Sequence, residues 1–431
     1  MKSNNRQLKI ILGVFCVLAM AVLIPVITNA IFLTPLDNTQ ISNSFGTANN
    51  PDMIWTGSNY GLVWSDSRKN KEIEIYFTRL NGFGEEVASE VKVSNNLDKI
   101  SDHPSVIWDN NAYAVVWSED CKLYFNKLDK DGEKYGGIKT IISSSDNCSD
   151  MPSLTWDGIN YGVIWQQGVN SAETSQIFFI RLDYSGQRKG NEIQISKTVD
   201  SKNPSFVWNG LEYGVVWQAN GQIYFNKLNV NGNRQLDDIR ISEISNNSAN
   251  PEIIWNGSGY GIIWQGYDNK EQEQIYFAKL NGNGDKEIER AITFNEDQDY
   301  SINPSIVWND SDSEYGIVWQ SEDGQMYFVN IDKDGHWKSK LTQISQTDIH
   351  GINNPTIALG TSYYAFAWQD ARGGNGNEIY FAQFAFSDLA QLDQGLLLAF
   401  IKEANGNAWM IIVSVLAVAV LFLIYRAKRK S

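Results

Sequence analysis

The sequence predicts an all-β fold, a seven-bladed β-propeller in which an N-terminal strand closes the last blade. The main observation is a phrase such as "NPSFVWNGLEYGVVWQ" (203–218), which recurs seven times at a period of 47–53 residues. Each copy holds four short runs of aromatic and β-branched residues between Asn, Asp and Gly turns, and such runs indicate strands. Four-stranded antiparallel units at this period are typical of propeller blades. The copies, numbered here as blades 1 to 7, begin at Pro51, Pro104, Pro152, Pro204, Pro251, Pro304 and Pro355.

Each blade is expected to contain four strands, a to d, joined by hairpins. In blade 4 they are "PSFVW" (204–208), "YGVVW" (213–217), "IYFNKL" (223–228) and "IRIS" (239–242). Asn209-Gly210 suits the first hairpin, because glycine accepts the positive φ of a tight turn. The antiparallel order places the b–c and d–a connections on one face of the ring.

The two ends of the array predict how the ring closes. Blade 7 has a c strand, "EIYFAQF" (378–384), but no d strand follows it. Upstream of blade 1, "TQISNSFGTANNP" (39–51) matches the d strand and the following loop of other copies. The N-terminal segment is therefore expected to pair with the c strand of blade 7, which removes an exposed sheet edge.

Both ends of the chain carry long apolar runs. Residues 1–33 combine a basic start with an uncharged apolar stretch, and form either a signal peptide or an uncleaved signal anchor. Residues 408–425 are long enough for a transmembrane helix, and the basic tail 426–431 is expected in the cytoplasm. The propeller, 36–386, and the juxtamembrane segment, 387–407, are then extracellular at the cell membrane.

The charge of the chain argues against a nucleic-acid partner. Residues 31–425 hold all 50 acidic residues and 28 basic ones, a net charge of −22. Such a surface repels phosphate backbones. The expected partners are the membrane, through the C-terminal anchor, and an extracellular glycan or protein ligand.

The repeated aromatic residues are interpreted as architecture. Thirteen of the fifteen Trp fall at two positions of the phrase, on strands a and b. Exposed Trp can stack on sugars, but large rings also fill the space between diverging blades, which favours a core role. The Gly after the Tyr, as in Gly214, lets a flat ring lie against the backbone. Asn precedes Pro in five copies, where we expect an extended residue that ties the loop. The alternative is a ring of amides that holds an ion or water.

The cysteines and sequons fit an exported chain. Cys121 is expected in a b–c loop and Cys148 in the next d–a loop, on the same face, so a disulfide between them is expected. Sequons for N-glycosylation occur at Asn147, Asn246, Asn256 and Asn309.

Motifs for catalysis or for cofactors give no positive signal. The "DKDG" turns (129–132 and 332–335) resemble the start of a calcium loop but lack its later acidic ligands, so plain hairpins are expected and calcium is unsupported. The three His lie in different blades without metal-site spacing. No catalytic residue, metal or cofactor is assigned. A carboxylate pair for glycoside hydrolysis remains an alternative that nothing in the sequence selects.

The most distinctive local feature is "WSDSR" (64–68) in blade 1 and "WQDAR" (368–372) in blade 7, each before an "EIYF" strand. This W-x-D-x-R pattern resembles the repeats of TolB-like and WD40-like cell-surface β-propellers over residues 36–386, although the other five copies lack the Asp-Arg pair. The resemblance implies that the pair braces the b–c loop by a charge-assisted hydrogen bond. Direct ligand contact is the alternative, so the ligand-face candidates are Asp66, Arg68, Asp370 and Arg372.

The expected function is recognition or adhesion by a membrane-anchored extracellular propeller, without catalysis. Fold alone does not give function, and two alternatives stay open. One is an extracellular glycan-active hydrolase or lyase, and the other is a structural component of the cell envelope. Sialidase activity is disfavoured. It needs three Arg that converge on a carboxylate, but of the eight Arg in residues 36–386 only Arg68 and Arg372 are expected on the face with the b–c connections, and no Asp-box repeat is present.

Overall fold

A computed structural model describes residues 38–385, with gaps at 44–45, 69–71, 96–98, 136–139, 144–146, 170–173, 294–299, 346–350 and 375. Contacts divide the chain into two units, and the fold described below is that of Pro35–Phe384. The expectations for 1–33, 387–407, 408–425 and 426–431 fall outside the described residues. Within the described part of the chain, no helix is both long and apolar enough to cross a membrane.

The strands form seven four-stranded antiparallel sheets, one for each predicted blade. Blade 1 contains β2 (Ala48–Trp55), β3 (Asn59–Asp66), β4 (Glu74–Asn81) and β5 (Val91–Lys92). Blade 2 contains β6 (Ser101–Trp108), β7 (Tyr113–Glu119), β8 (Lys122–Leu128) and β9 (Thr140–Ile141). Blade 3 contains β10 (Ser149–Trp156), β11 (Tyr161–Val169), β12 (Thr174–Leu182) and β13 (Arg188–Gln194). Blade 4 contains β14 (Ser201–Trp208), β15 (Glu212–Ala219), β16 (Gln222–Asn229) and β17 (Ile239–Arg240). Blade 5 contains β18 (Asn246–Trp255), β19 (Gly259–Tyr267), β20 (Glu273–Asn281) and β21 (Lys286–Ala291). Blade 6 contains β22 (Ser301–Asn309), β23 (Glu314–Ser321), β24 (Met326–Ile331) and β25 (Thr342–Gln343). Blade 7 contains β26 (Asn353–Leu359), β27 (Tyr363–Asp370) and β28 (Glu378–Ala385), and its fourth strand is the N-terminal β1 (Thr39–Gln40).

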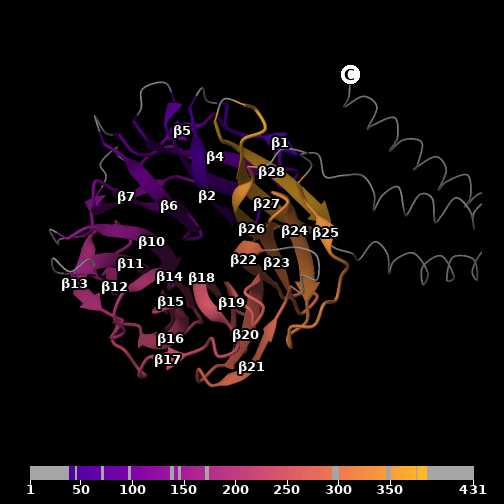
Figure 1. Cartoon of the computed structure of the whole chain (residues 1–431). Helices are drawn as coiled ribbons and strands as arrows, with labels where there is room; N and C mark the ends of the chain where they lie inside the picture. Colours follow the sequence, from indigo (N-terminus) through magenta and orange to yellow (C-terminus); the bar gives the residue numbers. More distant parts are fainter. Residues whose placement is uncertain are drawn as a thin grey trace, which may run out of the picture. The chain divides into compact units, whose positions relative to one another are not determined.

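The seven sheets close into a ring around their innermost strands (Figure 1). Each a strand contacts the a strand of the next blade, and β26 of blade 7 contacts β2 of blade 1. As predicted, the N-terminal strand closes blade 7: β1 pairs antiparallel with β28, with Thr39 opposite Phe381 and Gln40 opposite Tyr380. The seven-bladed propeller is confirmed. We call the side with the b–c and d–a connections the b–c face, and the opposite side the a–b face.

The d strands are shorter than predicted. β1, β5, β9, β17 and β25 each contain only two residues, whereas β13 and β21 are longer. In blade 4 the Ser242 hydroxyl accepts the backbone N–H of Ile223 at 2.8 Å and donates to Oε1 of Gln222 at 2.9 Å. Serine therefore takes the place of a ladder partner, and the strand ends within the "IRIS" run.

The aromatic phrase forms the core between blades. The strand-b Trp side chains are buried: Trp64, Trp117, Trp165, Trp217, Trp264, Trp319 and Trp368. The strand-a Trp rings lie on the strand-b Tyr of their own blade, as in Trp208 and Tyr213, whose centroids are 4.7 Å apart. Aromatic pairs at such distances add to the stabilisation from burial. The core interpretation therefore holds.

The glycine after each Tyr leaves room for the next blade. A Cβ built on Gly214 would lie 2.3 Å from Cε1 of Tyr260, in blade 5. Gly61 stands in the same relation to Tyr113, and Gly261 to Tyr315. The ring of one blade thus lies flat on the backbone of its neighbour, as the sequence predicts.

The residue before each proline is not extended, and that expectation was wrong. All seven have positive φ, between 47° and 51°: Asn50, His103, Met151, Asn203, Asn250, Asn303 and Asn354. The register of each a strand shifts at this point, as between Lys202 and Ser205 in blade 4. Such a bulge uses a left-handed residue, and asparagine tolerates that conformation better than most residues. This explains why Asn recurs there.

Candidate functional site

The Asp-Arg pair of blade 1 is bonded within its own blade. Asp66 is buried and accepts hydrogen bonds from the Trp64 indole at 3.3 Å, the Arg68 backbone N–H at 2.9 Å and the Arg68 Nε at 3.3 Å. The Arg68 guanidinium also bonds to Glu90 and lies 3.5 Å from the centroid of the Tyr76 ring. This geometry is that of a loop brace.

The pair in blade 7 repeats this arrangement. Asp370 is buried and accepts from the Trp368 indole at 3.2 Å, the Arg372 backbone N–H at 2.8 Å and Arg372 Nε at 2.7 Å. Arg372 lies 4.1 Å from the Tyr380 ring centroid and donates to Asn38 at 3.2 Å. All four ligand-face candidates are thus engaged internally, and the geometry favours bracing over ligand contact.

The amide side chains before the prolines tie neighbouring blades around the axis on the b–c face. Each Nδ2 group donates to an Asn side chain of the next blade: Asn203 to Asn250 at 2.6 Å, Asn250 to Asn303 at 3.0 Å, and Asn303 to Asn353 at 2.7 Å. Asn354 continues the series by donating to Asn50 at 2.7 Å. Each of these Nδ2 groups donates to the Oδ1 of an Asn in the next blade, which favours the loop-tying interpretation over an ion site.

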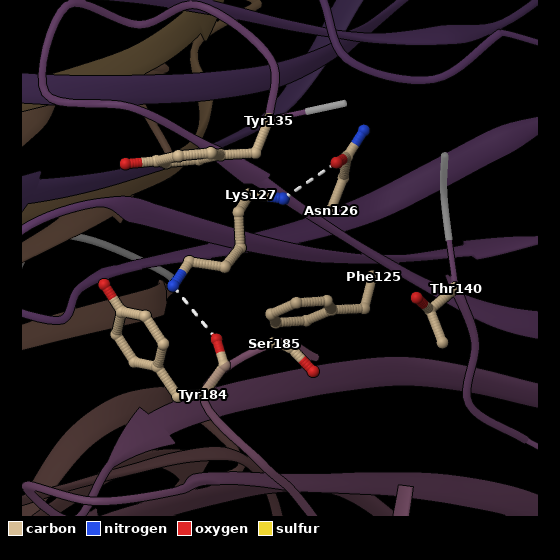
Figure 2. Close-up of a pocket in the computed structure, with 7 residues that line it drawn as sticks. All are labelled: Phe125, Asn126, Lys127, Tyr135, Thr140, Tyr184 and Ser185. Atoms are coloured by element: carbon tan, nitrogen blue, oxygen red, sulfur yellow. Dashed lines mark hydrogen bonds between the residues drawn. The ribbon is translucent and has the colours of Figure 1, made fainter. Parts of the chain in front are cut away.

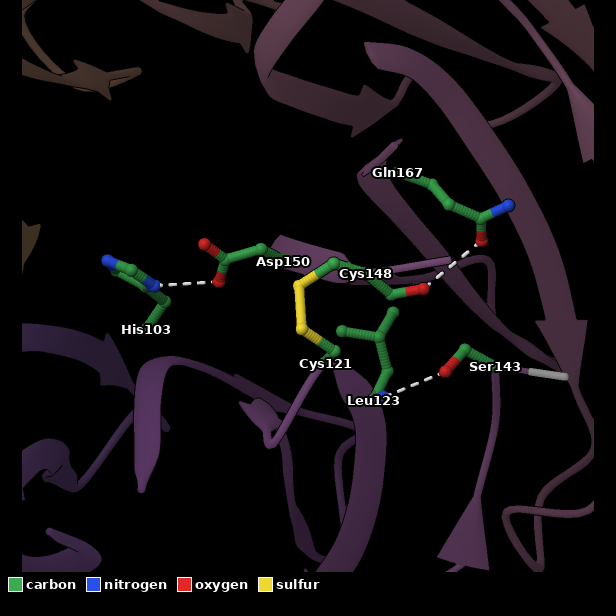
Figure 3. The surroundings of a disulfide bond; sticks show 8 residues. His103, Cys121, Leu123, Ser143, Cys148, Asp150 and Gln167 are labelled. Atoms are coloured by element: carbon green, nitrogen blue, oxygen red, sulfur yellow. Dashed lines mark hydrogen bonds and ion pairs between the residues drawn. A yellow bond between two sulfur atoms is a disulfide. The ribbon is translucent and has the colours of Figure 1, made fainter. Parts of the chain in front are cut away.

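Blades 2 and 3 are joined by other means on this face. His103 Nδ1 lies 2.8 Å from Oδ1 of Asp150, and the sulfurs of Cys121 and Cys148 are bonded (Figure 3). Burial opposes the charged imidazolium, but the hydrogen bond and charge of Asp150 outweigh it and raise the pKa of His103. At Met151, next in the ring, there is no amide to donate to blade 4.

We expect the disulfide to contribute about 3–4 kcal/mol to the free energy of unfolding. The two cysteines are 27 residues apart, and a cross-link over a loop of this length removes a corresponding entropy from the unfolded chain. Denaturation of the double variant C121S/C148S measures the loss. Reductant should destabilise the natural protein and leave this variant unchanged; equal stability with and without reductant would contradict the prediction.

Two carboxylates on the inner strands have raised pKa values. Asp52 accepts the backbone N–H of Val106 in blade 2 at 2.8 Å, and Glu252 accepts that of Ile306 in blade 6 at 3.0 Å. Burial raises the pKa of Asp52 to about 6 and that of Glu252 to about 7. Each carboxylate therefore satisfies a backbone N–H at the edge of the neighbouring a strand. We assign no catalytic acid–base role to these two residues.

We expect the melting temperature to fall between pH 5 and pH 8. A group whose pKa rises on folding binds its proton more tightly in the folded chain, so its contribution is complete below the unfolded pKa and lost as pH rises through the folded pKa. For Asp52 and Glu252 this window runs from about pH 4 to about pH 7, and for His103 it begins near pH 6.5. At ~1.4 kcal/mol per pKa unit, the change amounts to a few kcal/mol.

Thermal unfolding at constant ionic strength measures this effect. The variant D52N/E252Q keeps an oxygen acceptor at both positions but does not titrate, so it should flatten most of the pH dependence. A melting temperature that rises towards pH 8 in the natural protein would contradict the prediction.

The calcium-like turns are ordinary hairpins. In the first, Asp129 Oδ1 accepts the backbone N–H groups of Asp131 and Glu133 at 2.9 Å, and Gly132 has a φ of 86°. The second turn repeats this pattern at Asp332. Within the described residues, no three His, Cys, Asp or Glu side chains come close enough to hold a metal ion.

The four sequons differ in exposure. Asn147 and Asn246 are exposed near the b–c face. Asn256 is buried and donates to the Tyr315 hydroxyl at 2.7 Å, and Asn309 is buried with its amide bonded to Asp312 at 2.8 Å. Only the first two leave space for a glycan on the folded chain.

On the a–b face, strand-c side chains of blades 1, 2, 4 and 7 donate to a backbone carbonyl in the c–d turn of the next blade. Among the described residues, four hydrogen bonds of this kind are formed: Arg79 donates to the carbonyl of Lys130 (2.8 Å), Lys127 to that of Tyr184 (3.1 Å), Lys227 to that of Gly282 (3.1 Å) and Gln383 to that of Gly82 (3.1 Å). This inter-blade joint recurs in the architecture and was not predicted from the sequence.

The joint between blades 2 and 3 opens a cavity of about 320 Å³. Figure 2 shows that the rings of Tyr135 and Tyr184 lie on either side of the Lys127 side chain. The cavity is lined by Phe125, Asn126, Lys127, Tyr135, Thr140, Tyr184 and Ser185. The position of Tyr184 in the turn holds Gly82, Lys130, Val230, Gly282 or Lys333 in other blades. Two tyrosines at this joint are therefore a local exception.

Exposed aliphatic residues lie at the a–b turns of blades 3 and 4. Ile159 is 72% exposed and Leu211 is 83% exposed. Blades 1, 2 and 5 have Ser58, Asn111 and Ser258 at the same turn position. All these turns were predicted as plain hairpins, but a comparison of the seven copies at this position shows the exception in the sequence.

Comparisons with known proteins establish the fold. The sequence matches no protein-family model and no curated protein. Among solved structures, hydrazine synthase from Kuenenia stuttgartiensis is similar over 81% of this chain and 98% of that chain, with 9% identity and a TM-score of 0.53. A Dos1 propeller is similar over 82% and 96%, with 8% identity and a TM-score of 0.49. At 9% identity, the likeness to the hydrazine synthase structure indicates a shared fold and carries neither a family nor an activity.

Proposed function

We propose that this chain is a membrane-anchored recognition module with an extracellular propeller built from TolB-like repeats, which binds a glycan or protein ligand. The binding surface that we propose is the a–b face of blades 2 to 4. This proposal moves the ligand face away from the Asp-Arg pairs, because those four side chains brace their own loops.

The observation that supports this surface is the placement of exposed apolar residues where most other blades have glycine or polar residues. Ile159 and Leu211 occupy equivalent turns of neighbouring blades, and Tyr184 and Val230 occupy the c–d turns of the same two blades. Single exposed apolar residues are ordinary, whereas a group on one face is typical of an interaction site. None of the four positions requires an apolar residue for the fold, since other blades do without it.

The two alternative functions, a glycan-active hydrolase or lyase and a structural component of the cell envelope, gain no specific support. A hydrolase or lyase needs a carboxylate pair with access to substrate, but the two acids with raised pKa, Asp52 and Glu252, cap backbone N–H groups of the next blade. A structural envelope component would self-associate, and no feature of the described residues selects that role.

The proposal is tested with the full-length protein in lipid nanodiscs, applied to an immobilised panel of neutral and acidic oligosaccharides and of peptides. We expect I159S/L211S to weaken retention on the panel members that bind the natural protein by about tenfold or more. The matched control is V199S/I244S, which removes aliphatic side chains that are 57% and 50% exposed on the b–c face. If only the control variant loses retention, the ligand surface lies on the b–c face instead.

A further inference from the structure

We infer that the cavity between blades 2 and 3 is a saccharide site that takes one uncharged pyranose ring. This inference deepens the proposed function and rests on it, because it assigns a ligand class to a defined part of the a–b face. Three properties of the cavity carry it: its walls, its electrical neutrality and the fixed position of one of its tyrosines.

The walls combine aromatic rings with hydroxyl groups. Tyr135 and Tyr184 are 50% and 49% exposed, and the Lys127 ammonium covers part of the Tyr184 ring, so a ligand meets the parts of the two rings that Lys127 leaves open. The volume of about 320 Å³ is at the lower end of the range for small-molecule sites, ~300–1,000 Å³, and suits one small ring. Thr140 and Ser185 add hydroxyls to the lining. A pyranose presents an apolar C–H face for an aromatic ring and hydroxyls at its edge for polar groups.

The cavity is electrically neutral in spite of its lysine. Lys127 Nζ lies 3.0 Å from Oδ2 of Asp109, whose side chain is buried. Burial opposes ionisation of Asp109, but hydrogen bonds from Tyr161 and Lys127 outweigh it and lower the pKa of Asp109. The ammonium also lies 3.5 Å from the Tyr184 ring centroid. Because this charge is already compensated, an anionic ligand gains little there, and an uncharged one is favoured.

Tyr184 is held in place before any ligand arrives. Its hydroxyl accepts a hydrogen bond from Asn111 at 3.0 Å, and its carbonyl accepts one from Lys127 at 3.1 Å. Its ring forms a T-shaped contact with the ring of Trp156, with centroids 6.1 Å apart. A preformed ring loses little conformational freedom on binding, which is what a stacking platform requires.

Saturation-transfer NMR tests the inference with the full-length protein in nanodiscs prepared without glycoside detergents. The probes are the methyl pyranosides of glucose, galactose, mannose and N-acetylglucosamine, with methyl glucuronide as the charged comparison. We expect at least one neutral pyranoside to bind with a Kd on the order of 1 mM, a typical affinity for so small a contact. Y135A and Y184A should each weaken this binding at least tenfold.

Two further variants separate ligand contact from structural damage. Y184F keeps the ring and loses the hydroxyl bonded to Asn111, so it should retain binding. W337A removes another exposed aromatic side chain, in blade 6, and should leave binding unchanged. Unchanged binding in Y135A and Y184A, or binding of the glucuronide alone, would overturn the inference.

The outcome for this site is distinguishable from that for the proposed function. A protein that is retained on panel peptides through Ile159 and Leu211 but binds no pyranoside keeps its recognition function and loses the saccharide site. A protein that binds a pyranoside in the cavity while I159S/L211S has no effect on retention keeps the site and loses the wider surface.

Discussion

Replacing Ile41 by Asp is expected to lower the free energy of unfolding by more than about 4 kcal/mol. Ile41 follows the closing strand β1, its N–H donates to the carbonyl of Ile379 at 2.8 Å, and its side chain is buried with Trp64 and Phe381 between blades 7 and 1. Losing a buried aliphatic side chain of this size costs ~2–5 kcal/mol, and burying an unpaired carboxylate adds to that cost. Equilibrium denaturation measures the change.

The matched control for I41D is T39D. Thr39 is an exposed residue of β1, so the same charge enters the same segment without burial. Its effect should stay within about 0.5 kcal/mol, the usual range for surface changes. If I41D costs no more than T39D, this segment does not close the ring in solution.

Replacing Gly214 by Val is expected to destabilise the protein by about 3 kcal/mol or more. The new Cβ would lie 2.3 Å from the Tyr260 ring, which is fully buried and whose hydroxyl is bonded to Asn209 at 2.9 Å. The ring has no free space to move into, and overpacking of this kind typically costs ~1–3 kcal/mol, more when the neighbour is fixed. Thermal and denaturant unfolding measure the loss.

Two variants control for the effect of valine itself. Gly373 has open space around its position, so G373V makes the same chemical change without a clash and should alter stability by less than about 1 kcal/mol. G214A should fall between the two, since Ala114 occupies the equivalent position in blade 2. Similar losses in G214V and G373V would show that the inter-blade clash is not the cause.

Much of the fold could be predicted because it is written in a repeat. The blade count, the four strands and the closing segment all follow from the spacing of prolines and aromatic residues. Two predictions, the conformation of the residue before Pro and the length of the d strand, were wrong because they rested on local preferences alone. Proline does restrict the preceding residue, yet the bulge in the inner strand selects a left-handed conformation at Asn203 and its equivalents. The Ser242 hydroxyl shortens the d strand by replacing a ladder partner.

The candidate sites were less predictable, because the residues that meet there are separated in the chain. The Asp-Arg pairs stood out in the sequence as exceptions, but their partners, Glu90 and Tyr76 for Arg68, are not adjacent to them in the chain. The cavity at blades 2 and 3 joins Tyr135 to Tyr184 across a blade boundary. No spacing in one linear sequence shows which exposed turns share a joint.

The sequence by itself determined the architecture, since hydrophobic periodicity and turn chemistry repeat in every blade and act locally. The tertiary structure decided which polar groups are already bonded and which surfaces remain available. Asn354 and Asn50 are 304 residues apart in the chain, yet they form one hydrogen bond because the ring closes there. Contacts of this kind depend on three-dimensional distance. Asp66 and Arg68 brace their own loop, and the recognition surface that we propose therefore lies on the a–b face instead.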